Sequence, residues 1–155
     1  MSKSLKRVAR ALSDAGLPDT IIEAGETRTA EQAAAACGCA LDQIVKSILF
    51  CGVSSGALRL FLTAGGNRVC AQKASALAAE DLGRADIGIV RAKTGFAIGG
   101  VAPIGHLTPH PIWIDPRLMA FETVWAAAGT PRHVFSIDPQ VLMSLTNATL
   151  ADFVE

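Results

Sequence analysis

The chain has 155 residues, of which half are hydrophobic and 18% are charged. This length suits one domain with a sizeable core, and the hydrophobic content excludes a chain that is disordered over most of its length. Fourteen basic and fourteen acidic side chains cancel, so any contact with nucleic acid has to come from a local patch. We therefore expect a single domain over residues 1–155.

The cysteines and the hydropathy pattern indicate the compartment. No charged-then-apolar leader opens the chain, and no apolar run approaches the length of a membrane span. This predicts a reducing cytoplasm in which the cysteines are buried free thiols. Cys37-x-Cys39 lacks the two-residue gap usual for zinc knuckles, and no second Cys/His pair follows at a suitable distance. We expect no metal site.

An amphipathic helix is predicted over residues 4–15, where apolar residues recur at helical spacing before Gly16. One face of it is basic. Its members, spaced i, i+3, i+4 and i+7, are Lys3, Lys6, Arg7 and Arg10. Two interpretations stand at this point: a solvated helix face, or a local patch for nucleic acid.

Strands and a capped helix follow. Thr20–Ala24 is a short strand candidate, and Thr29 with Gln32 has the spacing of a capping box for a helix that ends at Gly38. Two runs rich in Ile, Leu, Val and Phe then predict a hairpin. They are Ile44–Cys51 and Leu58–Thr63, joined by the turn 53–56.

Lys46 is the only charge within the first hairpin strand, and period-two alternation places it on the same face as Ile44, Ile48 and Phe50. A lysine beside apolar neighbours is either an edge residue with its head in water or a buried, functional ammonium. The pattern alone leaves both readings open.

The second half of the chain alternates irregularly between strand and helix patterns. The expected elements are a turn at 65–67, a helix at 72–80, an apolar run at 87–90, a strand at 112–115, a turn or short helix at 116–121, and hairpin strands at 122–128 and 133–137. A last helix is capped by Asp138. The C-terminal region is expected to pack through Leu142, Leu145 and Leu150, with Phe153 closing it. This order favours an α+β fold with a mixed or antiparallel sheet.

A glycine-dense segment runs from Lys93 to His106 and contains Gly95, Gly99, Gly100 and Gly105. Such density weakens a helix or strand, so the segment is either a sharp loop with a bulge or a binding loop whose free N–H groups face a ligand. The spacing fits neither a dinucleotide fingerprint nor a P-loop. A cradle of N–H groups suits a carbonyl oxygen that gains negative charge during acyl transfer.

A fixed cation would assist such a cradle, and Lys46 is the natural candidate because it is the one charge in an apolar strand. His106, at the end of the loop, is either a surface histidine or a group that orients water or a ribose hydroxyl.

The segments Asp42–Ser47 and Thr94–Gly105 together resemble the YbaK/ProX family. The likeness runs from the helix after Thr29 to the last helix of the chain. Members are aminoacyl-tRNA deacylases, and a similar domain is inserted in bacterial prolyl-tRNA synthetases. The resemblance implies a compact mixed, barrel-like β-sheet surrounded by helices, and no metal or organic cofactor.

The resemblance also implies the site residues. The family's strand lysine, needed for activity, falls on Lys46, and the loop whose amides hold the aminoacyl ester and terminal adenosine supplies Gly100, Val101 and Ala102 as catalytic groups. The implied substrate-binding residues are Thr94, Gly95, Phe96, Gly99, Pro103, His106, Ala127 and Gly129.

The hairpin region indicates a branch of the family. Members specific for cysteinyl-tRNA carry a serine shortly before a glycine near this hairpin, followed by an aspartate. In this chain the serine is replaced by alanine before Gly129, and Phe135 stands near the position of the aspartate. The chain is thus more similar to the ProX-type branch, whose members act on mischarged tRNAs such as alanyl-tRNA(Pro).

The leading hypothesis is trans-editing in the cytoplasm, in which the ester of a small wrong amino acid, such as Ala- or Cys-tRNA(Pro), is hydrolysed. The expected partner is the 3′ acceptor end of aminoacyl-tRNA, with prolyl-tRNA synthetase as a further candidate and no membrane contact; the oligomeric state stays open. Two alternatives remain: a non-catalytic module that binds aminoacyl-tRNA or a synthetase, and a small-molecule ester hydrolase.

Overall fold

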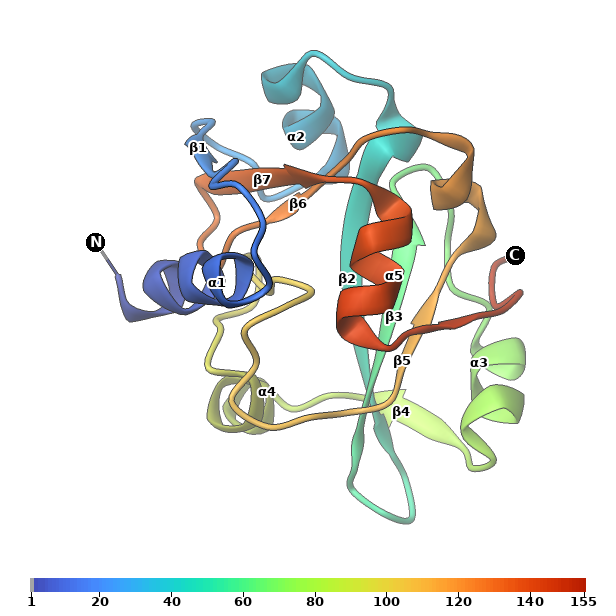
Figure 1. The fold of residues 1–155 in the computed structure, drawn as a ribbon. Coiled ribbons are helices and arrows are strands. Elements are labelled where there is room, and N and C mark those ends of the chain that lie inside the picture. Colours follow the sequence, from blue (N-terminus) through green and yellow to red (C-terminus); the bar gives the residue numbers. More distant parts are fainter. Residues whose placement is uncertain (1) are drawn as a thin grey trace.

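In a computed structural model, which describes residues 2–155, the chain folds into helices around one mixed β-sheet (Figure 1). The helices are α1 (Lys3–Asp14), α2 (Ala30–Cys37), α3 (Ala71–Ala78), α4 (Ile87–Thr94) and α5 (Pro139–Thr146), with 3-10 helices η1 (Leu41–Gln43) and η2 (Pro116–Ala120). The strands are β1 (Ile22–Glu23), β2 (Ile44–Gly52), β3 (Leu58–Ala64), β4 (Leu82–Arg84), β5 (Ile112–Ile114), β6 (Val124–Ala127), β7 (His133–Ile137) and β8 (Thr149–Leu150).

The sheet has the order β1-β7-β6-β2-β3-β5-β8, with β4 beside β2. The hairpins β2/β3 and β6/β7 are antiparallel, whereas β2/β6, β3/β5 and β5/β8 are parallel. The predicted α+β class and mixed sheet are confirmed. The sheet is open rather than a closed barrel, because β1 and β8 end the order at opposite sides and are only two residues long.

Each face of the sheet is covered by different helices (Figure 1). The main core joins one face to α1 and α5 and includes Val8 and Leu142, both fully buried. Smaller clusters cover the other face, where α2 packs on Ile44 and α3 packs near Phe61. Alternation along β2 therefore sends successive side chains to two separate cores.

Several local signals produce the predicted helix ends. The Thr29 hydroxyl accepts from the Gln32 N–H at 3.1 Å, and the Gln32 side chain accepts from the Thr29 N–H at 3.2 Å, which confirms the capping box. Gly38 ends this helix with φ 65°. Asp138 caps α5 and Pro139 occupies its first turn, also as predicted.

The region before the glycine loop differs from the prediction. Helix α4 covers the apolar run and continues through Lys93 and Thr94, so the loop begins at Gly95 rather than at Lys93. The cause is the Asp86 side chain, which accepts from the Ile89 N–H at 3.1 Å and caps the start of the helix. The helix was not predicted because Gly88, in its first turn, has a low helix propensity. Strand β4 was not predicted, being only three residues long.

The C-terminal packing is confirmed only in part. Leu142 and Phe153 are fully buried, but Leu145 is 36% exposed and Leu150 is 48% exposed. The helix ends at Asn147, which has φ 55°, so Leu150 lies beyond it on the edge strand β8. Helical spacing therefore does not predict on which face Leu150 lies.

Strand β2 lies at the centre of the sheet, yet one of its edges is incompletely paired. Towards β3, Val45 to Cys51 all have partners. On the other side β6 pairs only with Ile44 and Val45, and β4 pairs only with Phe50 to Gly52. Residues 46–49 thus border a gap between β6 and β4. An unpaired strand edge leaves peptide groups available for another molecule.

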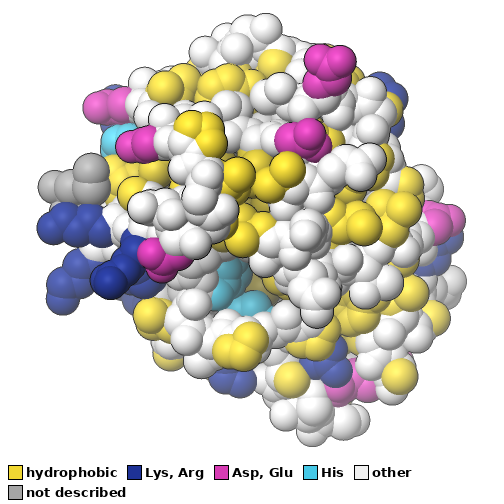
Figure 2. All heavy atoms as spheres, viewed as in Figure 1, with side chains coloured by type: hydrophobic (Ala, Val, Ile, Leu, Met, Phe, Trp, Pro, Cys, Tyr) yellow, Lys and Arg dark blue, Asp and Glu magenta, His cyan; other side chains and the backbone are white. Residues whose placement is uncertain are grey.

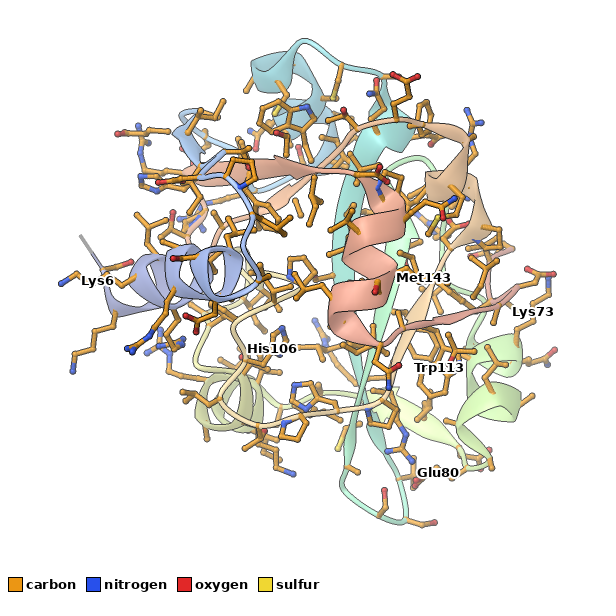
Figure 3. All side chains as sticks on the ribbon, in the orientation of Figure 1. Lys6, Lys73, Glu80, His106, Trp113 and Met143 are labelled. Atoms are coloured by element: carbon orange, nitrogen blue, oxygen red, sulfur yellow. The ribbon has the colours of Figure 1, made fainter. Side chains whose placement is uncertain are left out.

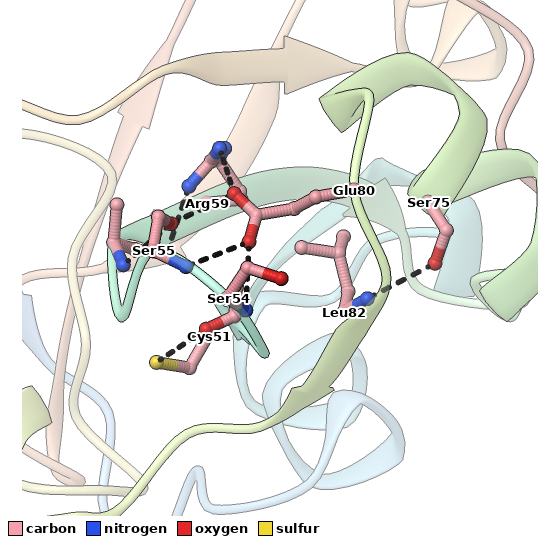
Figure 4. A network of polar contacts seen from close by, with 9 residues as sticks. Cys51, Ser54, Ser55, Arg59, Ser75, Glu80 and Leu82 are labelled. Carbon is pink, nitrogen blue, oxygen red and sulfur yellow. Dashed lines mark hydrogen bonds and ion pairs between the residues drawn. The ribbon is translucent and has the colours of Figure 1, made fainter.

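The far end of the β2–β3 hairpin is tied to the end of α3 by Glu80 (Figure 4). Its carboxylate accepts from the N–H groups of Ser54 and Ser55 at 3.2 and 3.0 Å and from the Ser55 hydroxyl at 2.7 Å. It also pairs with Arg59 at 2.8 Å. These hydrogen bonds, those from Ser55 above all, lower the pKa of Glu80 to about 2.

This network predicts a pH-dependent contribution to stability. The pKa of Glu80 is depressed from 4.5 to about 2, so its contribution is present above pH 4.5 and is lost as the pH falls towards 2. The difference in unfolding free energy between the wild type and Glu80→Gln should be largest at neutral pH and vanish near pH 2. Denaturant titrations across this range measure it. Glu122→Gln, an exposed site, is the control, and a pH-independent difference would contradict the assignment.

Candidate active site

A cavity of about 510 Å³ opens at the gap beside β2. Its walls come from β2, from the segment that leads into α2, from β6 and from the glycine loop. The surfaces are mostly aliphatic, and the lining residues used below are Thr27, Arg28, Thr29, Lys46, Ser47, Arg84, Ile98, Gly99, Val101, Trp125 and Ala127. The incomplete pairing of β2 thus creates a recess in the sheet.

Four of the residues predicted for the site line this cavity: Lys46, Gly99, Val101 and Ala127. The fold therefore brings the strand lysine and the glycine loop to one place, although they lie some fifty residues apart in the chain. The hairpin strand β6 adds Ala127 from a third segment. The other predicted residues lie outside the lining.

The Lys46 side chain is half-buried and its ammonium donates to the Asn67 carbonyl at 2.5 Å. Burial is the main reason that its pKa is lowered, while the nearby carboxylates of Glu31, Asp115 and Asp42 act in the opposite direction. An ammonium has three N–H groups, and this contact uses one of them. The others remain for a ligand in the cavity.

The acceptor of Lys46 is itself held in place. Asn67 donates from its side chain to Asp115 at 2.9 Å, and Asp115 is only 2% exposed. Asp115 also accepts from the N–H groups of Ala64 and Arg117, at 3.1 and 2.9 Å. Two carboxylates therefore fix the turn that positions the lysine, because Asp42 accepts from the Gly66 N–H at 2.8 Å in the same turn.

The set of loop amides that are free to bind a ligand differs from the predicted set. The Gly100 N–H donates to the Ala97 carbonyl at 3.1 Å and is already used. By contrast, the N–H groups of Gly99, Val101 and Ala102 donate to no atom of residues 2–155. Gly99 and Val101 line the cavity, whereas Ala102 is fully buried beside it. The structure therefore favours Gly99 and Val101 as donors to a ligand.

The glycines also permit close packing, which was not predicted from the sequence. A Cβ atom on Gly100 would lie 2.8 Å from the Thr130 carbonyl carbon, and one on Gly129 would lie 2.8 Å from the Ser4 oxygen. Real Cβ atoms essentially never come so close, so larger residues would push the loop, the hairpin turn and α1 apart. Gly129 therefore supports the site from outside the cavity.

Arg7 connects α1 to both ends of the glycine loop. Its guanidinium donates to the Gly95 carbonyl at 2.5 Å and to the Gly105 carbonyl at 3.2 Å. It also lies 5.0 Å from the centre of the Phe96 ring. The predicted basic face is thus corrected: Arg7 turns towards the loop, whereas Lys3, Lys6 and Arg10 are exposed on α1. Basic side chains gather over α1 in Figure 2, and Lys6 projects from this helix in Figure 3.

Other predicted substrate-binding residues are part of the loop's support. Thr94 is fully buried and donates to the Val90 carbonyl at 2.6 Å, and Phe96 and Pro103 are buried as well. Gly95 ends α4 with φ 81°. None of these residues lines the cavity, so the structure offers no direct substrate contact for them.

His106 is half-buried below α1 in the view of Figure 3, and both of its ring nitrogens make hydrogen bonds. Its Nε2 contacts the Ala102 carbonyl at 2.5 Å, and its Nδ1 contacts Nε2 of His110 at 2.8 Å. Because a carbonyl only accepts, His106 donates from Nε2 and accepts at Nδ1. Burial lowers the pKa of His106 to about 4, which leaves this imidazole neutral at neutral pH and able to keep both contacts.

Several residues of the cavity were not predicted from the sequence. Arg28 and Thr29 come from the segment before α2, and Arg84 follows from the unpredicted strand β4. Trp125 and Ser47 lie on strands that were predicted, but only the pairing shows that they meet at the gap. Ser47 carried one available signal, its position next to Lys46 in a strand.

Among residues 2–155 no group of three or more His, Cys, Asp or Glu side chains is arranged to hold a metal ion. In the same residues no helix is long and apolar enough to cross a membrane.

The fold and the cavity have counterparts in known proteins. The chain matches the aminoacyl-tRNA editing domain over residues 24–145. It is 44% identical to the crystal structure of a candidate trans-editing enzyme for prolyl-tRNA synthetase, with a TM-score of 0.93 and coverage of 100% of this chain and 99% of that one. Hypothetical protein APE2540 is 25% identical, with a TM-score of 0.88 and coverage of 96% and 99%.

A curated relative, the uncharacterized protein YwhH of Bacillus subtilis (strain 168), is 30% identical over 114 residues, which are 74% of this chain and 72% of that protein. The chain therefore belongs to the aminoacyl-tRNA editing domain family, and the resemblance to YbaK/ProX-type editing domains is confirmed.

The Arg7 contacts generate a prediction about the loop. Arg7→Met keeps an apolar stem but removes the donors to the Gly95 and Gly105 carbonyls. We expect a loss of about 1–3 kcal/mol in unfolding free energy, since partly buried carbonyls are left without partners. Hydrogen exchange of the amides in residues 95–105 should rise at the same time.

The control for this prediction is Arg10→Met on the same helix, where the side chain is exposed. A surface substitution of this kind should change stability by no more than about 0.5 kcal/mol. Equal effects of the two substitutions on exchange in the loop would show that Arg7 has no special role.

Proposed function

We propose that this protein edits tRNA in trans by hydrolysing the ester of a small wrong amino acid, with Ala- or Cys-tRNA(Pro) as the expected substrates. The observation that carries the proposal is the cavity at the gap in the sheet, where Lys46 meets the glycine loop. Membership of the editing family supports the reaction class. Alanine replaces serine before Gly129, which favours the ProX-type branch and therefore alanyl-tRNA(Pro).

The groups around the cavity suit water or the tRNA 2′-hydroxyl as the attacking group. The lining contains no His, Cys, Asp or Glu, so no hydroxyl of the lining has an imidazole or carboxylate beside it to activate it as a nucleophile. In this mechanism the amides of Gly99 and Val101 polarise the ester carbonyl, and Lys46 stabilises charge that develops in the transition state. Ala102 contributes by holding its neighbour in place.

A second site of this kind meets a need of translation. A synthetase pocket separates side chains that differ by one methylene by only about 10–200-fold, so small amino acids escape its selection. The aliphatic walls of the cavity, which include Ile98 and Val101, leave limited room for a side chain beside the terminal nucleoside. Correct, larger residues are excluded by size. Prolyl-tRNA synthetase is the partner expected to release such products, in the cytoplasm.

The activity is tested with a panel of mischarged tRNAs carrying Ala, Cys, Ser and Thr esters. We expect alanyl-tRNA(Pro) to be hydrolysed faster than its spontaneous rate. Lys46→Ala should lower this rate on the order of 100-fold, the usual effect of removing one preorganised electrostatic group. Lys73→Ala is the matched control, because Lys73 is an exposed lysine on α3.

The outcomes separate the three hypotheses. Rates that stay at the spontaneous level for every ester, with tRNA still bound, would favour a non-catalytic binding module. Hydrolysis of free alanyl esters with no gain from the tRNA would favour a small-molecule hydrolase. An unchanged rate in Lys46→Ala would remove this lysine from the mechanism.

The exposed part of the basic face gives a separate prediction. Lys3, Lys6 and Arg10 are exposed on α1, and Lys6 lies on the opposite side of the molecule from Lys73 (Figure 3). If they contact acceptor-stem phosphates, replacing all three with Gln should reduce the slope of log KM against log salt by about 2–3, roughly 0.7–0.9 per contact. The value of kcat should not change. The Lys73→Gln variant removes one positive charge at another exposed site and should leave the slope unchanged. An unaltered slope in the triple variant would show that Lys3, Lys6 and Arg10 form a solvated face.

A further inference from the structure

Ser47 carries an unexplained hydroxyl in the wall of the cavity. Its Oγ is buried and has no hydrogen-bond partner, the only side-chain nitrogen or oxygen in residues 2–155 with this property. The residue as a whole is half-buried and lines the cavity. A buried hydroxyl without a partner reduces stability, so its presence in a native protein requires an explanation such as a functional role.

The pairing of β2 with β3 indicates the direction in which the peptide groups of Ser47 point. The Gly52 N–H donates to the Ala57 carbonyl at 2.9 Å across the hairpin. Because peptide groups alternate along an antiparallel strand, those of Lys46 point towards β3 and those of Ser47 point towards the gap. The two side chains leave β2 on opposite faces. Ser47 therefore presents its peptide groups to the gap without facing the Lys46 ammonium.

The hydrogen-bonding groups of the lining indicate which part of a ligand Ser47 could bind. An aminoacyl ester brings an α-amino group, a hydrogen-bond donor, into a cavity whose lining has no Asp or Glu. Neutral acceptors must hold it. The Thr27 hydroxyl donates to the Pro131 carbonyl at 2.8 Å, and the Thr29 hydroxyl caps α2. Ser47 is the remaining side-chain hydroxyl of the lining.

We propose that Ser47 binds the α-amino group of the aminoacyl ester, with its Oγ and its outward-facing carbonyl as acceptors. This inference rests on the proposed function, since it assumes that an aminoacyl group occupies the cavity. It assigns to Ser47 a binding role and no covalent step. This role would also explain why the Ser47 hydroxyl, which has no hydrogen-bond partner in the free protein, follows Lys46 on β2.

The test uses ligands that cannot be hydrolysed, so that it does not depend on turnover. Adenosine carrying L-alanine through a 3′-amide, and the same compound with its amine acetylated, are titrated into the wild type, Ser47→Ala and Ser47→Thr by calorimetry. Ser47→Ala should weaken binding of the free amine by about ten-fold, as expected for one lost hydrogen bond to a charged group. Binding of the acetylated ligand should not change, and Ser47→Thr should retain the wild-type preference.

Thermal unfolding distinguishes a binding role of Ser47 from a structural one. If Ser47 stabilised the fold, Ser47→Ala would lower the melting temperature. Because Ser47 Oγ has no partner to lose, Ser47→Ala should leave the melting temperature unchanged or raise it. Ser75→Ala is the matched control. The Ser75 hydroxyl accepts from the Leu82 N–H at 3.2 Å, so this substitution should lower the melting temperature without affecting either ligand.

The results separate the two proposals. An equal loss of affinity for both ligands in Ser47→Ala, or a lower melting temperature with unchanged binding, would overturn the role of Ser47. A wild type that binds the free amine with the predicted dependence on Ser47 but hydrolyses no mischarged tRNA would overturn the proposed function and leave this inference standing. A wild type that binds neither ligand would contradict both.

Discussion

The incomplete pairing of β2 is the constraint on which the site depends. A central strand normally has neighbours along both edges, and here β6 and β4 cover only the two ends of one edge. The space between them becomes the cavity, bordered by Lys46 and Ser47. Unpaired peptide groups at a strand edge are a liability in most proteins. In this fold they are recessed, and the glycine loop lies across from them.

The loop is held by contacts that converge from outside the cavity. Arg7 bonds both of its ends, Gly100 packs on Thr130, and His106 accepts a hydrogen bond from His110 while donating to Ala102. A group that stabilises developing charge works best when it is already oriented before the reaction. These supports therefore explain how a glycine-rich segment can present Gly99 and Val101 in a defined position, and why most of the residues flanking them are buried.

Much of the fold could be predicted because its signals are local. The capping box at Thr29 and the apolar runs of β2 and β3 depend on neighbours in the chain, and they appear where expected. The site could be predicted only in part. Lys46 and Gly99 stood out by residue type, but which amides are free depends on a bond from Gly100 to Ala97, and the cavity depends on strand pairing. The sequence marks Ser47 only by its position next to Lys46, and its buried hydroxyl without a partner is seen only in the fold.

We propose that the gap beside β2 holds the aminoacyl end of tRNA. A crystal structure with the 3′-amide analogue of alanyl-adenosine tests it most directly. We expect the alanyl group to lie between residues 46–49 and the loop at Gly99 and Val101, with its carbonyl near the loop amides. Density for the analogue on another surface, with this cavity unchanged, would contradict this placement.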